Sequence, residues 1–232
     1  MYWRTPTTLF LGIIGFNSVM PVASDERTAF YRERASETYN ALWYFVAGTV
    51  AEIPYVFASS LLFTIILYPS VGFTGYDTFF YYLIVVALNA LVFVYLGQLM
   101  VYALPSVEVA STVGALLSAI FMLFAGFNPP TGNIPDGYIW VHYISPPSYT
   151  ISILVSLMFA DCPEEGGDGI SCQVLSGAPP SIGDVTLKQY VEGTFSMKHD
   201  NIWRNVGITI ALIVAFRALA LFALRYINHL KR

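Results

Sequence analysis

Apolar runs separated by short polar segments form the dominant pattern along the chain. A helix needs about 20 apolar residues to cross the hydrocarbon core of a bilayer. Four runs are that long, at residues 42–68, 78–104, 107–127 and 202–226. A fifth run, residues 7–23, is shorter, is interrupted by Asn17 and follows Arg4. The pattern predicts five spanning helices, of which the first is marginal.

Residues 128–201 differ from the rest of the chain. They hold eight acidic residues against Lys188 and Lys198, and eight prolines that prevent a long helix. The apolar run 151–160 within this segment is too short to span a bilayer. We interpret it as a re-entrant or interfacial helix capped by Ser148. A small folded element outside the membrane is the alternative.

The overall composition supports a membrane protein. Hydrophobic residues make up 56% of the 232 residues and charged residues only 11%, and the mean hydropathy is +0.61. This is more apolar surface than one soluble core of this size buries. The chain is therefore predicted to be a multi-pass protein surrounded by lipid, and no nucleic-acid partner is predicted for it.

The basic residues predict which side each loop faces. Arg27, Arg32 and Arg34 lie between the first two runs, and the chain ends in further basic residues, whereas residues 69–77 contain none. Lys and Arg accumulate in short cytoplasmic loops. Residues 24–41 and the tail are accordingly predicted to be cytoplasmic, and residues 128–201 extracellular.

Cys162 and Cys172 both fall in the predicted extracellular loop. A disulfide between them would close a short loop and contribute about 2 to 3 kcal/mol. Two free thiols are the alternative. A metal site is not predicted, because no histidine lies at ligand spacing from either cysteine.

Catalytic motifs are missing from the sequence. It contains no G-x-x-x-x-G-K-[ST] phosphate loop, no H-E-x-x-H and no G-x-S-x-G. The chain alone is therefore predicted not to be an enzyme and to bind no cofactor. If ATP and Mg²⁺ drive its function, a partner or a separate domain must bind them.

Several short motifs follow one another in an order that is more specific than composition. They are ERTAFYRERA at residues 26–35, YNAL at 39–42, AEIPYV at 51–56, PSVEVA at 105–110, FAGF at 124–127, FSMKHD at 195–200 and FRALA at 216–220. In this order they closely resemble the second transmembrane domain of pleiotropic drug resistance transporters, the full-size G-subfamily ABC exporters. The resemblance covers nearly the whole chain.

The resemblance implies an all-α polytopic membrane protein with the G-subfamily, type II exporter-like fold. Residues 1–232 would form a single ABC-2 type transmembrane domain with about five spanning helices and a short re-entrant helix. Compared with the family, the first helix and the nucleotide-binding domains are missing, so the chain is expected to be a fragment.

The function that the resemblance implies is ATP-driven export of hydrophobic or amphipathic compounds, such as drugs or sterol-like lipids, by alternating access. The plasma membrane is the expected location. The expected partners are a nucleotide-binding domain, a second transmembrane domain and the lipid bilayer. An ATP-independent channel, a membrane scaffold and a non-functional gene fragment remain the alternatives.

In this family the first cytoplasmic loop of a membrane domain lies against the nucleotide-binding domain. This loop forms a short coupling helix in the family, so the resemblance implies a coupling role for the loop 24–41, with residues 28–38 as the helix. Its candidate aromatic and charged contacts are Phe30, Tyr31, Arg32, Glu33, Arg34 and Glu37. A solvated loop that only satisfies the positive-inside rule is the alternative.

Glu52 and Arg217 are ionisable residues inside predicted spans. Each costs on the order of 3 kcal/mol there unless it is paired or hydrated. They lie at similar depths from the cytoplasmic ends of their helices. We expect them to pair or to join a polar relay, and separate partners for each are the alternative.

The resemblance also implies a central substrate cavity at the interface with the other membrane domain, lined by the helices predicted here as first and fourth. The candidates are Phe10, Leu11, Ile14 and Asn17 from the first and Ser118, Ala119, Met122 and Leu123 from the fourth, with Phe127 in an apolar plug. Such side chains suit varied hydrophobic substrates. Ordinary helix packing is the alternative.

Overall fold

The structure is a computed structural model, and it describes residues 6–35, 41–73, 75–126, 129–160, 170–174 and 185–227. Its described part consists of helices, the segments that connect them and isolated bridge residues, such as the pair Val174 and Thr186. The α-helices are α1 (Pro6–Ala35), α2 (Ala41–Val71), α3 (Tyr76–Ala103), α4 (Val107–Leu123), α5 (Ile139–Ile144), α6 (Pro146–Phe159), α7 (Leu187–Phe195) and α8 (Ile202–Tyr226). Short 3-10 turns are η1 (Thr131–Asn133), η2 (Asp136–Tyr138), η3 (Ile170–Cys172) and η4 (His199–Asn201). The predicted all-α fold is confirmed.

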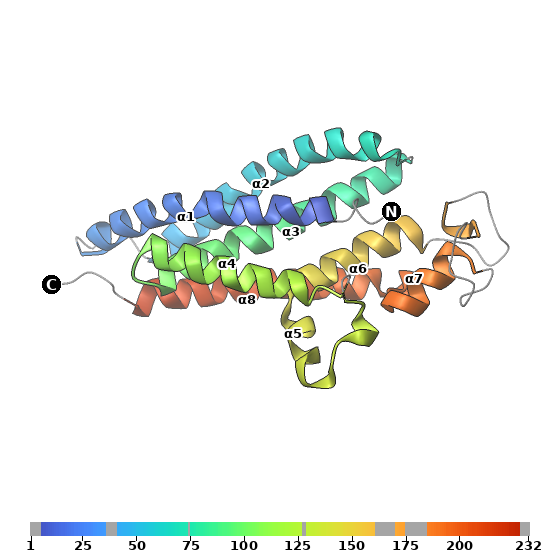
Figure 1. Ribbon diagram of the computed structural model, residues 1–232. Helices are drawn as coiled ribbons and strands as arrows, with labels where there is room; N and C mark the ends of the chain where they lie inside the picture. Colours follow the sequence, from blue (N-terminus) through green and yellow to red (C-terminus); the bar gives the residue numbers. More distant parts are fainter. Residues whose placement is uncertain are drawn as a thin grey trace.

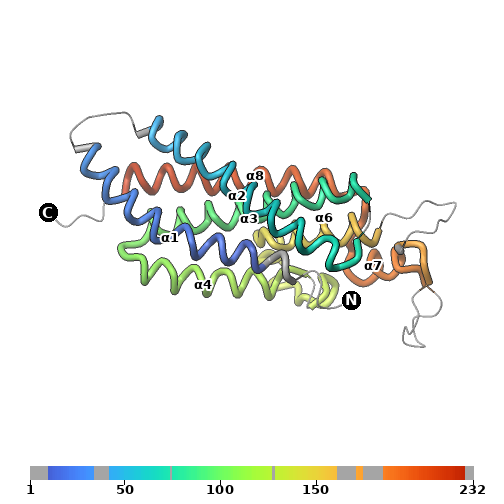
Figure 2. The backbone as a smooth tube through the Cα atoms, turned by 90° about the horizontal axis from the view of Figure 1, so that it is seen from above, coloured from blue at the N-terminus to red at the C-terminus, as the bar shows by residue number. Residues whose placement is uncertain are grey.

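The long helices lie side by side in an elongated bundle (Figures 1 and 2). α3 occupies its centre and packs against α1, α2, α4, α6 and α8. Within its apolar stretch 67% of the residues are buried, against 17% for α2 and 22% for α8. A helix that is apolar on all sides belongs in the interior, so the composition of α3 matches its place.

Three described helices are long and apolar enough to cross a membrane: Leu42–Val71, Tyr76–Ala103 and His199–Tyr226. They correspond to the predicted spans 42–68, 78–104 and 202–226. The predicted span 7–23 lies in the first part of α1. The predicted span 107–127 is shorter in the structure, since α4 has only 17 residues. By length and hydropathy, three of the five predicted spans are therefore found among the described helices.

α4 ends early because the chain turns at Gly126, whose φ of 83° disfavours a side chain. The chain then forms η1, η2 and α5 at the side of the bundle before α6 resumes the direction of its long axis (Figure 1). The hydroxyl of Ser145 donates a hydrogen bond of 2.9 Å to the Phe121 carbonyl, which ties the start of α6 to the end of α4. α4 and α6 therefore lie one after the other along the bundle, whereas residues 107–127 were predicted to span alone and residues 151–160 to form a re-entrant or interfacial helix.

The start of α6 differs from the prediction. Ser145 rather than Ser148 is the N-cap residue, and it makes no capping side-chain bond. Pro146 and Pro147 follow directly, and a proline at the first helical position has no N–H that needs a cap. Ser148 instead donates to the Ser145 and His142 carbonyls. The predicted Ser148 cap is wrong, whereas α6 itself packs against α3 and α8 as part of the bundle.

α1 extends further than predicted. It is one helix of 30 residues, so the first part of the predicted loop 24–41, residues 24–35, is helical. The run from Asp25 to Ala35 contains no glycine or proline and is rich in Glu, Arg and Ala, which favour helix. Residues 36–40 lie outside the described residues.

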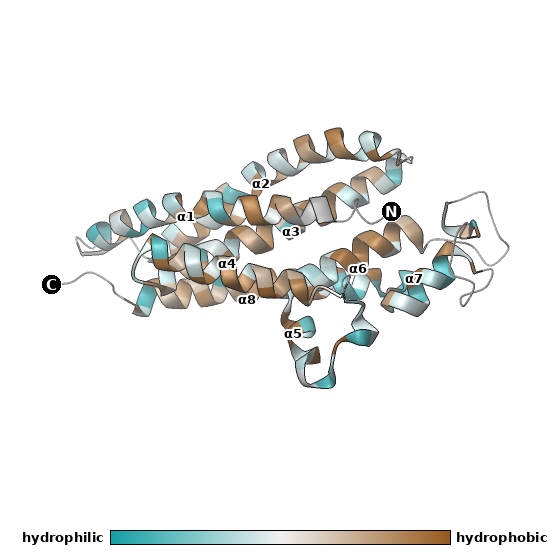
Figure 3. Ribbon diagram, in the orientation of Figure 1, coloured by the Kyte–Doolittle hydropathy of each residue, from teal (hydrophilic) through white to brown (hydrophobic). Residues whose placement is uncertain are grey.

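The two ends of the bundle are formed by different segments. At the end where α8 finishes, here called the tail end, lie the charged end of α1, the start of α2 and the α3–α4 turn (Figures 1 and 3). The α2–α3 turn, α7 and the start of α8 lie at the opposite end, called the loop end. The distribution of basic residues predicted that the segments at the tail end lie together on one side of the membrane. That this side is the cytoplasmic one stays a prediction.

Candidate functional site

Arg217 is a buried cation inside a predicted span of the described bundle, with only 8% of its surface exposed. Its guanidinium donates to Gln98 Oε1 on α3 and to Thr49 Oγ1 on α2, and to the Phe45 carbonyl at 3.3 Å. The guanidinium carbon also lies 4.2 Å from the ring centre of Phe45 and 4.4 Å from that of Tyr95. Hydrogen bonds and cation–π contacts together replace the water that a buried charge loses.

Gln98 connects this cation to Glu52. Its Nε2 donates a hydrogen bond of 3.0 Å to Glu52 Oε1, while its Oε1 accepts from Arg217. The three side chains come from α2, α3 and α8. We call Thr49, Glu52, Gln98 and Arg217 the polar network. The structure thus brings Glu52 and Arg217 into one network through Gln98, a residue that the sequence reasoning missed although it is a polar residue inside a predicted apolar span.

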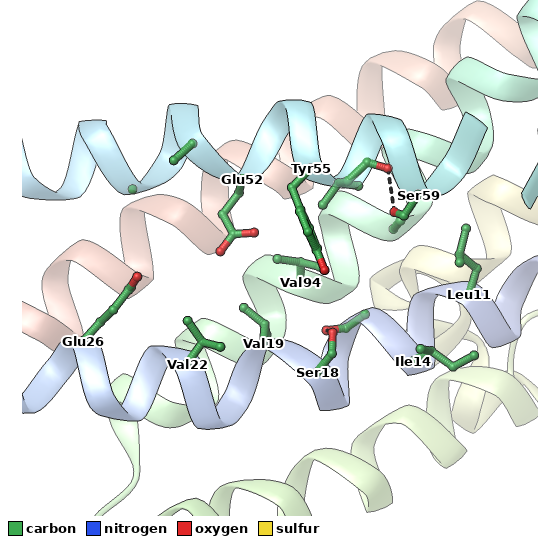
Figure 4. Close-up of a pocket in the computed structure, with 15 residues that line it drawn as sticks. Leu11, Ile14, Ser18, Val19, Val22, Glu26, Glu52, Tyr55, Ser59 and Val94 are labelled. Atoms are coloured by element: carbon green, nitrogen blue, oxygen red, sulfur yellow. Dashed lines mark hydrogen bonds between the residues drawn. The ribbon is translucent and has the colours of Figure 1, made fainter. Parts of the chain in front are cut away.

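A groove lies beside the network, between α1 and α2 with α3 as its floor (Figure 4). Its volume is about 560 Å³, within the range of small-molecule sites. α1 contributes Leu11, Ile14, Gly15, Ser18, Val19, Val22 and Glu26; α2 contributes Gly48, Ala51, Glu52, Tyr55, Val56 and Ser59; α3 contributes Ala90 and Val94. We call this the α1–α2 groove, and Glu52 belongs to both the groove and the polar network.

Glu26 lies in α1 beyond the predicted span 7–23, toward the tail end of the groove. Partial burial raises the pKa of its carboxyl, and the positive charge of Arg217 opposes that shift. Burial raises a carboxyl pKa because it disfavours the charged form.

The predicted cavity residues do not meet in one described pocket. Leu11 and Ile14 line the α1–α2 groove, but Phe10 and Asn17 do not. Asn17 is exposed and donates to the Ile13 carbonyl within its own helix, at 2.8 Å. On α4, Ser118 is buried, Met122 is half-buried, and Ala119 and Leu123 are exposed. Phe127 lies outside the described residues.

α1 and α4 pack closely at Gly114. A Cβ atom added at Gly114 of α4 would lie 2.0 Å from Cζ of Phe16 on α1. The Phe16 ring therefore occupies the space directly over the α4 backbone. Small residues at helix interfaces in membranes allow this close approach.

The predicted coupling residues divide into a buried and an exposed set. Phe30 is fully buried, its ring 5.1 Å from that of Tyr44 on α2. Tyr31 is also buried, and its hydroxyl donates to the Ile227 carbonyl at 2.6 Å. These two rings therefore hold α1 to its own bundle, where contacts with a partner were expected of them. Arg32 and Glu33 are exposed.

Arg34 and Glu37 are the other two predicted coupling residues. Arg34 belongs to the last turn of α1, and Glu37 lies outside the described residues.

The structure gives Arg27 a role that the sequence did not predict, since the sequence analysis noted it only as a basic residue between the first two apolar runs. It is 7% exposed, and its guanidinium donates to the carbonyls of Val101, Leu104 and Pro105 at 2.5, 2.7 and 3.2 Å. The last carbonyls of a helix have no hydrogen-bond donor within the helix. A cation there also interacts favourably with the negative end of the helix dipole. Arg27 thus caps α3 and fixes α1 to the α3–α4 turn.

Cys172 lies in η3 and is disulfide-bonded, and Cys162 lies outside the described residues. In the described ranges, no group of three His, Cys, Asp or Glu side chains is placed to hold a metal ion.

Comparisons with known proteins agree with this architecture. Residues 6–159 match the family described as ABC-2 type transporter, and residues 162–232 match the family described as CDR ABC transporter. The chain is 33% identical over 221 residues to ABC transporter G family member 36 of Arabidopsis thaliana. It is 32% identical over 225 residues to Pleiotropic drug resistance protein 1 of Nicotiana tabacum.

These matches cover 95% and 97% of the chain but only 14% and 15% of the two relatives. The three long apolar helices, the packing of α1, α4 and α6 against α3, and both family matches lead to one assignment. The chain belongs to the ABC-2 type transporter family, as a membrane domain of its G-subfamily, pleiotropic drug resistance group.

Proposed function

We propose that this chain is the membrane-spanning part of an ATP-driven exporter of hydrophobic or amphipathic compounds in the plasma membrane. The chain itself would carry no ATPase activity. A nucleotide-binding domain would bind ATP and Mg²⁺, and a second transmembrane domain would complete the transport path. The family membership supports this proposal, as does the name of the tobacco relative, a pleiotropic drug resistance protein.

The course of α1 is the observation that carries the proposal. This single helix reaches from Leu11 in the α1–α2 groove to the exposed Arg32 at the tail end. Near its charged end it is attached to three other helices: Arg27 bonds to the end of α3, Phe30 packs on Tyr44 of α2, and Tyr31 bonds to Ile227 after α8. A force applied to this end would therefore act on α2, α3 and α8 together.

This attachment suits a coupling element. The exposed side chains of Arg32 and Glu33, together with Arg34 and Glu37, would contact the nucleotide-binding domain. Closure of that domain on ATP would displace the charged end of α1. The displacement would reach the polar network, because Thr49, Gln98 and Arg217 lie on the same three helices that α1 engages. Helices that move as rigid bodies are a common route for such switching.

We retain the cavity between this domain and a second one as part of the proposal. Phe10 and Leu123 are 55% and 57% exposed, and Asn17 and Ala119 are exposed as well. These side chains are therefore accessible to another membrane domain or to substrate. Ser118, Met122 and Phe127 would complete the wall and the plug.

Charge reversal tests the coupling role. In the assembled transporter, reconstituted with its nucleotide-binding domains in vesicles, Arg32→Glu should lower transport of a fluorescent amphipathic dye about tenfold, because it places a like charge against the partner surface. Asp136→Lys is the matched control, since Asp136 is an exposed residue of η2 outside the tail end. ATP hydrolysis without substrate should remain in both variants.

Two outcomes would overturn the proposal. One is wild-type transport by Arg32→Glu, and the other is movement of the dye by the membrane domain without any nucleotide. The second result would favour an ATP-independent channel.

A further inference from the structure

The α1–α2 groove has an apolar half and an acidic half (Figure 4). Leu11 and Ile14 mark the apolar half toward the loop end, and Glu26 and Glu52 lie at the other half, toward the tail end. Tyr55 stands between them with 75% of its surface exposed. A pocket built in this way distinguishes the two ends of a ligand.

The acidic half lacks a matching cation. Neither lysine nor arginine is among the described residues that line the groove. Arg217 is the nearby cation, and its hydrogen bonds go to Gln98, Thr49 and the Phe45 carbonyl. Two carboxylates against one guanidinium leave a net negative charge beside the groove.

The two carboxylates differ in how they are held. Glu52 accepts a hydrogen bond from Gln98. The carboxylate of Glu26 has no hydrogen-bond donor among the described residues, since the Tyr44 hydroxyl donates to the Glu26 backbone carbonyl instead. A carboxylate without a donor, at the rim of an apolar groove, favours the approach of a positive group.

The size of the groove argues for a small molecule as its occupant. A helix with its side chains is about 10 to 12 Å wide, so a volume of about 560 Å³ would hold only about one helical turn. Ligand sites of drug size occupy a similar volume.

We propose that the α1–α2 groove is a binding site for a lipophilic monocation, with the positive group between Glu26 and Glu52 and the apolar body against Leu11 and Ile14. The Tyr55 ring offers a cation–π contact to the same charge. An anion of equal shape would meet the two carboxylates and be repelled. The inference deepens the proposed export function by naming a substrate class for it.

Gly48 provides a steric test of the site. It lines the groove, and a Cβ atom added there would meet no atom within 4 Å. Gly48→Leu should therefore fill part of the groove without disturbing the helices. Gly207 on α8 is equally open but is not among the groove residues, so Gly207→Leu is the matched control. For the charge, Glu26→Gln is paired with Glu108→Gln, an exposed glutamate in the first turn of α4.

The experiment measures equilibrium binding of tetraphenylphosphonium to the full chain in lipid nanodiscs, with binding to empty nanodiscs subtracted. Tetraphenylborate, an anion of the same shape, is the comparison ligand. Wild type should bind the phosphonium ion saturably and the borate only as empty nanodiscs do. Glu26→Gln should weaken phosphonium binding about tenfold, as expected for one lost charge at close range in a partly hydrated site, and Gly48→Leu should remove the saturable component.

Gly207→Leu and Glu108→Gln should bind as wild type does. Equal affinities in Glu26→Gln and Glu108→Gln would overturn the site, as would saturable binding that survives Gly48→Leu. Saturable borate binding of similar affinity would likewise contradict it.

These outcomes are separate from those of the export proposal, because equilibrium binding requires no ATP. Retained cation binding with nucleotide-independent transport would remove the export proposal alone. Nucleotide-dependent, Arg32-sensitive transport without phosphonium binding would remove the cation site alone.

Discussion

Arg217 illustrates how a single residue can bring a positive charge into an apolar bundle. Its planar guanidinium forms hydrogen bonds to two helices while the rings of Phe45 and Tyr95 contact it. A lysine has a compact head group and lacks the fork of donors that these contacts use. The arrangement depends equally on Gln98, whose amide can donate to Glu52 and accept from Arg217 at the same time.

Removing the Gln98 amide should therefore destabilise the bundle. We expect Gln98→Leu to lower the free energy of unfolding by about 1 to 3 kcal/mol, because Glu52 and Arg217 would each lose a partner in a buried setting. Unfolding by a denaturing detergent, followed by tryptophan fluorescence, measures the change. Asn17→Leu is the control: it removes an amide from the exposed side of α1, and a change within about 0.5 kcal/mol is expected. Equal effects of both substitutions would contradict the proposed importance of the network.

At the scale of the elements, glycine positions determine how closely the helices pack. Added Cβ atoms at Gly12 of α1 and Gly97 of α3 would lie 2.5 and 2.8 Å from side chains of the facing helix. Gly114 plays the same part between α4 and α1. In lipid the hydrophobic effect does not drive helices together, so close van der Waals contact becomes more important.

Gly114→Ala should consequently weaken the contact between α1 and α4. Its new methyl group would overlap the Phe16 ring, with a cost of about 1 to 3 kcal/mol from overpacking. The same substitution at Gly207, where the space is open, should stabilise the protein by about 0.5 to 1 kcal/mol through helix propensity. The midpoints of thermal unfolding in detergent compare the two variants. If Gly114→Ala were as stable as Gly207→Ala, the tight packing of Phe16 would be refuted.

For the whole molecule, the separation of the two ends has a consequence for topology. The tail end contains Arg27 and Arg32 near the end of α1, and Arg225 near the end of α8. The loop end contains α7 and the disulfide-bonded Cys172. Basic residues inside and a disulfide outside are compatible with one orientation across the membrane.

Cysteine labelling in intact cells tests that orientation. A membrane-impermeant maleimide should label Gly137→Cys, at an exposed position of η2, without permeabilisation. Arg32→Cys should react only after the cells are permeabilised. The native Cys172 is already disulfide-bonded and should contribute no signal. Labelling of Arg32→Cys from outside would place the charged end of α1 away from the cytoplasm, and the coupling proposal could not stand.

The sequence by itself determined the all-helical membrane class, the transporter family and the helices α2, α3 and α8, whose bounds lie within a few residues of the predicted 42–68, 78–104 and 202–226. These features follow from local properties of the chain. The thickness of the bilayer sets the length that an apolar run needs to span it, and the order of the motifs can be read directly from the sequence. Only the tertiary structure decided that α1 continues through residue 35, that α4 and α6 follow one another along the bundle, and that a groove lies between α1 and α2. It also decided that Gln98 joins Glu52 to Arg217, across 46 and 119 positions of sequence. Hydropathy reports how apolar a helix is, whereas the face it buries and the distant side chains it meets depend on how the other helices pack around it.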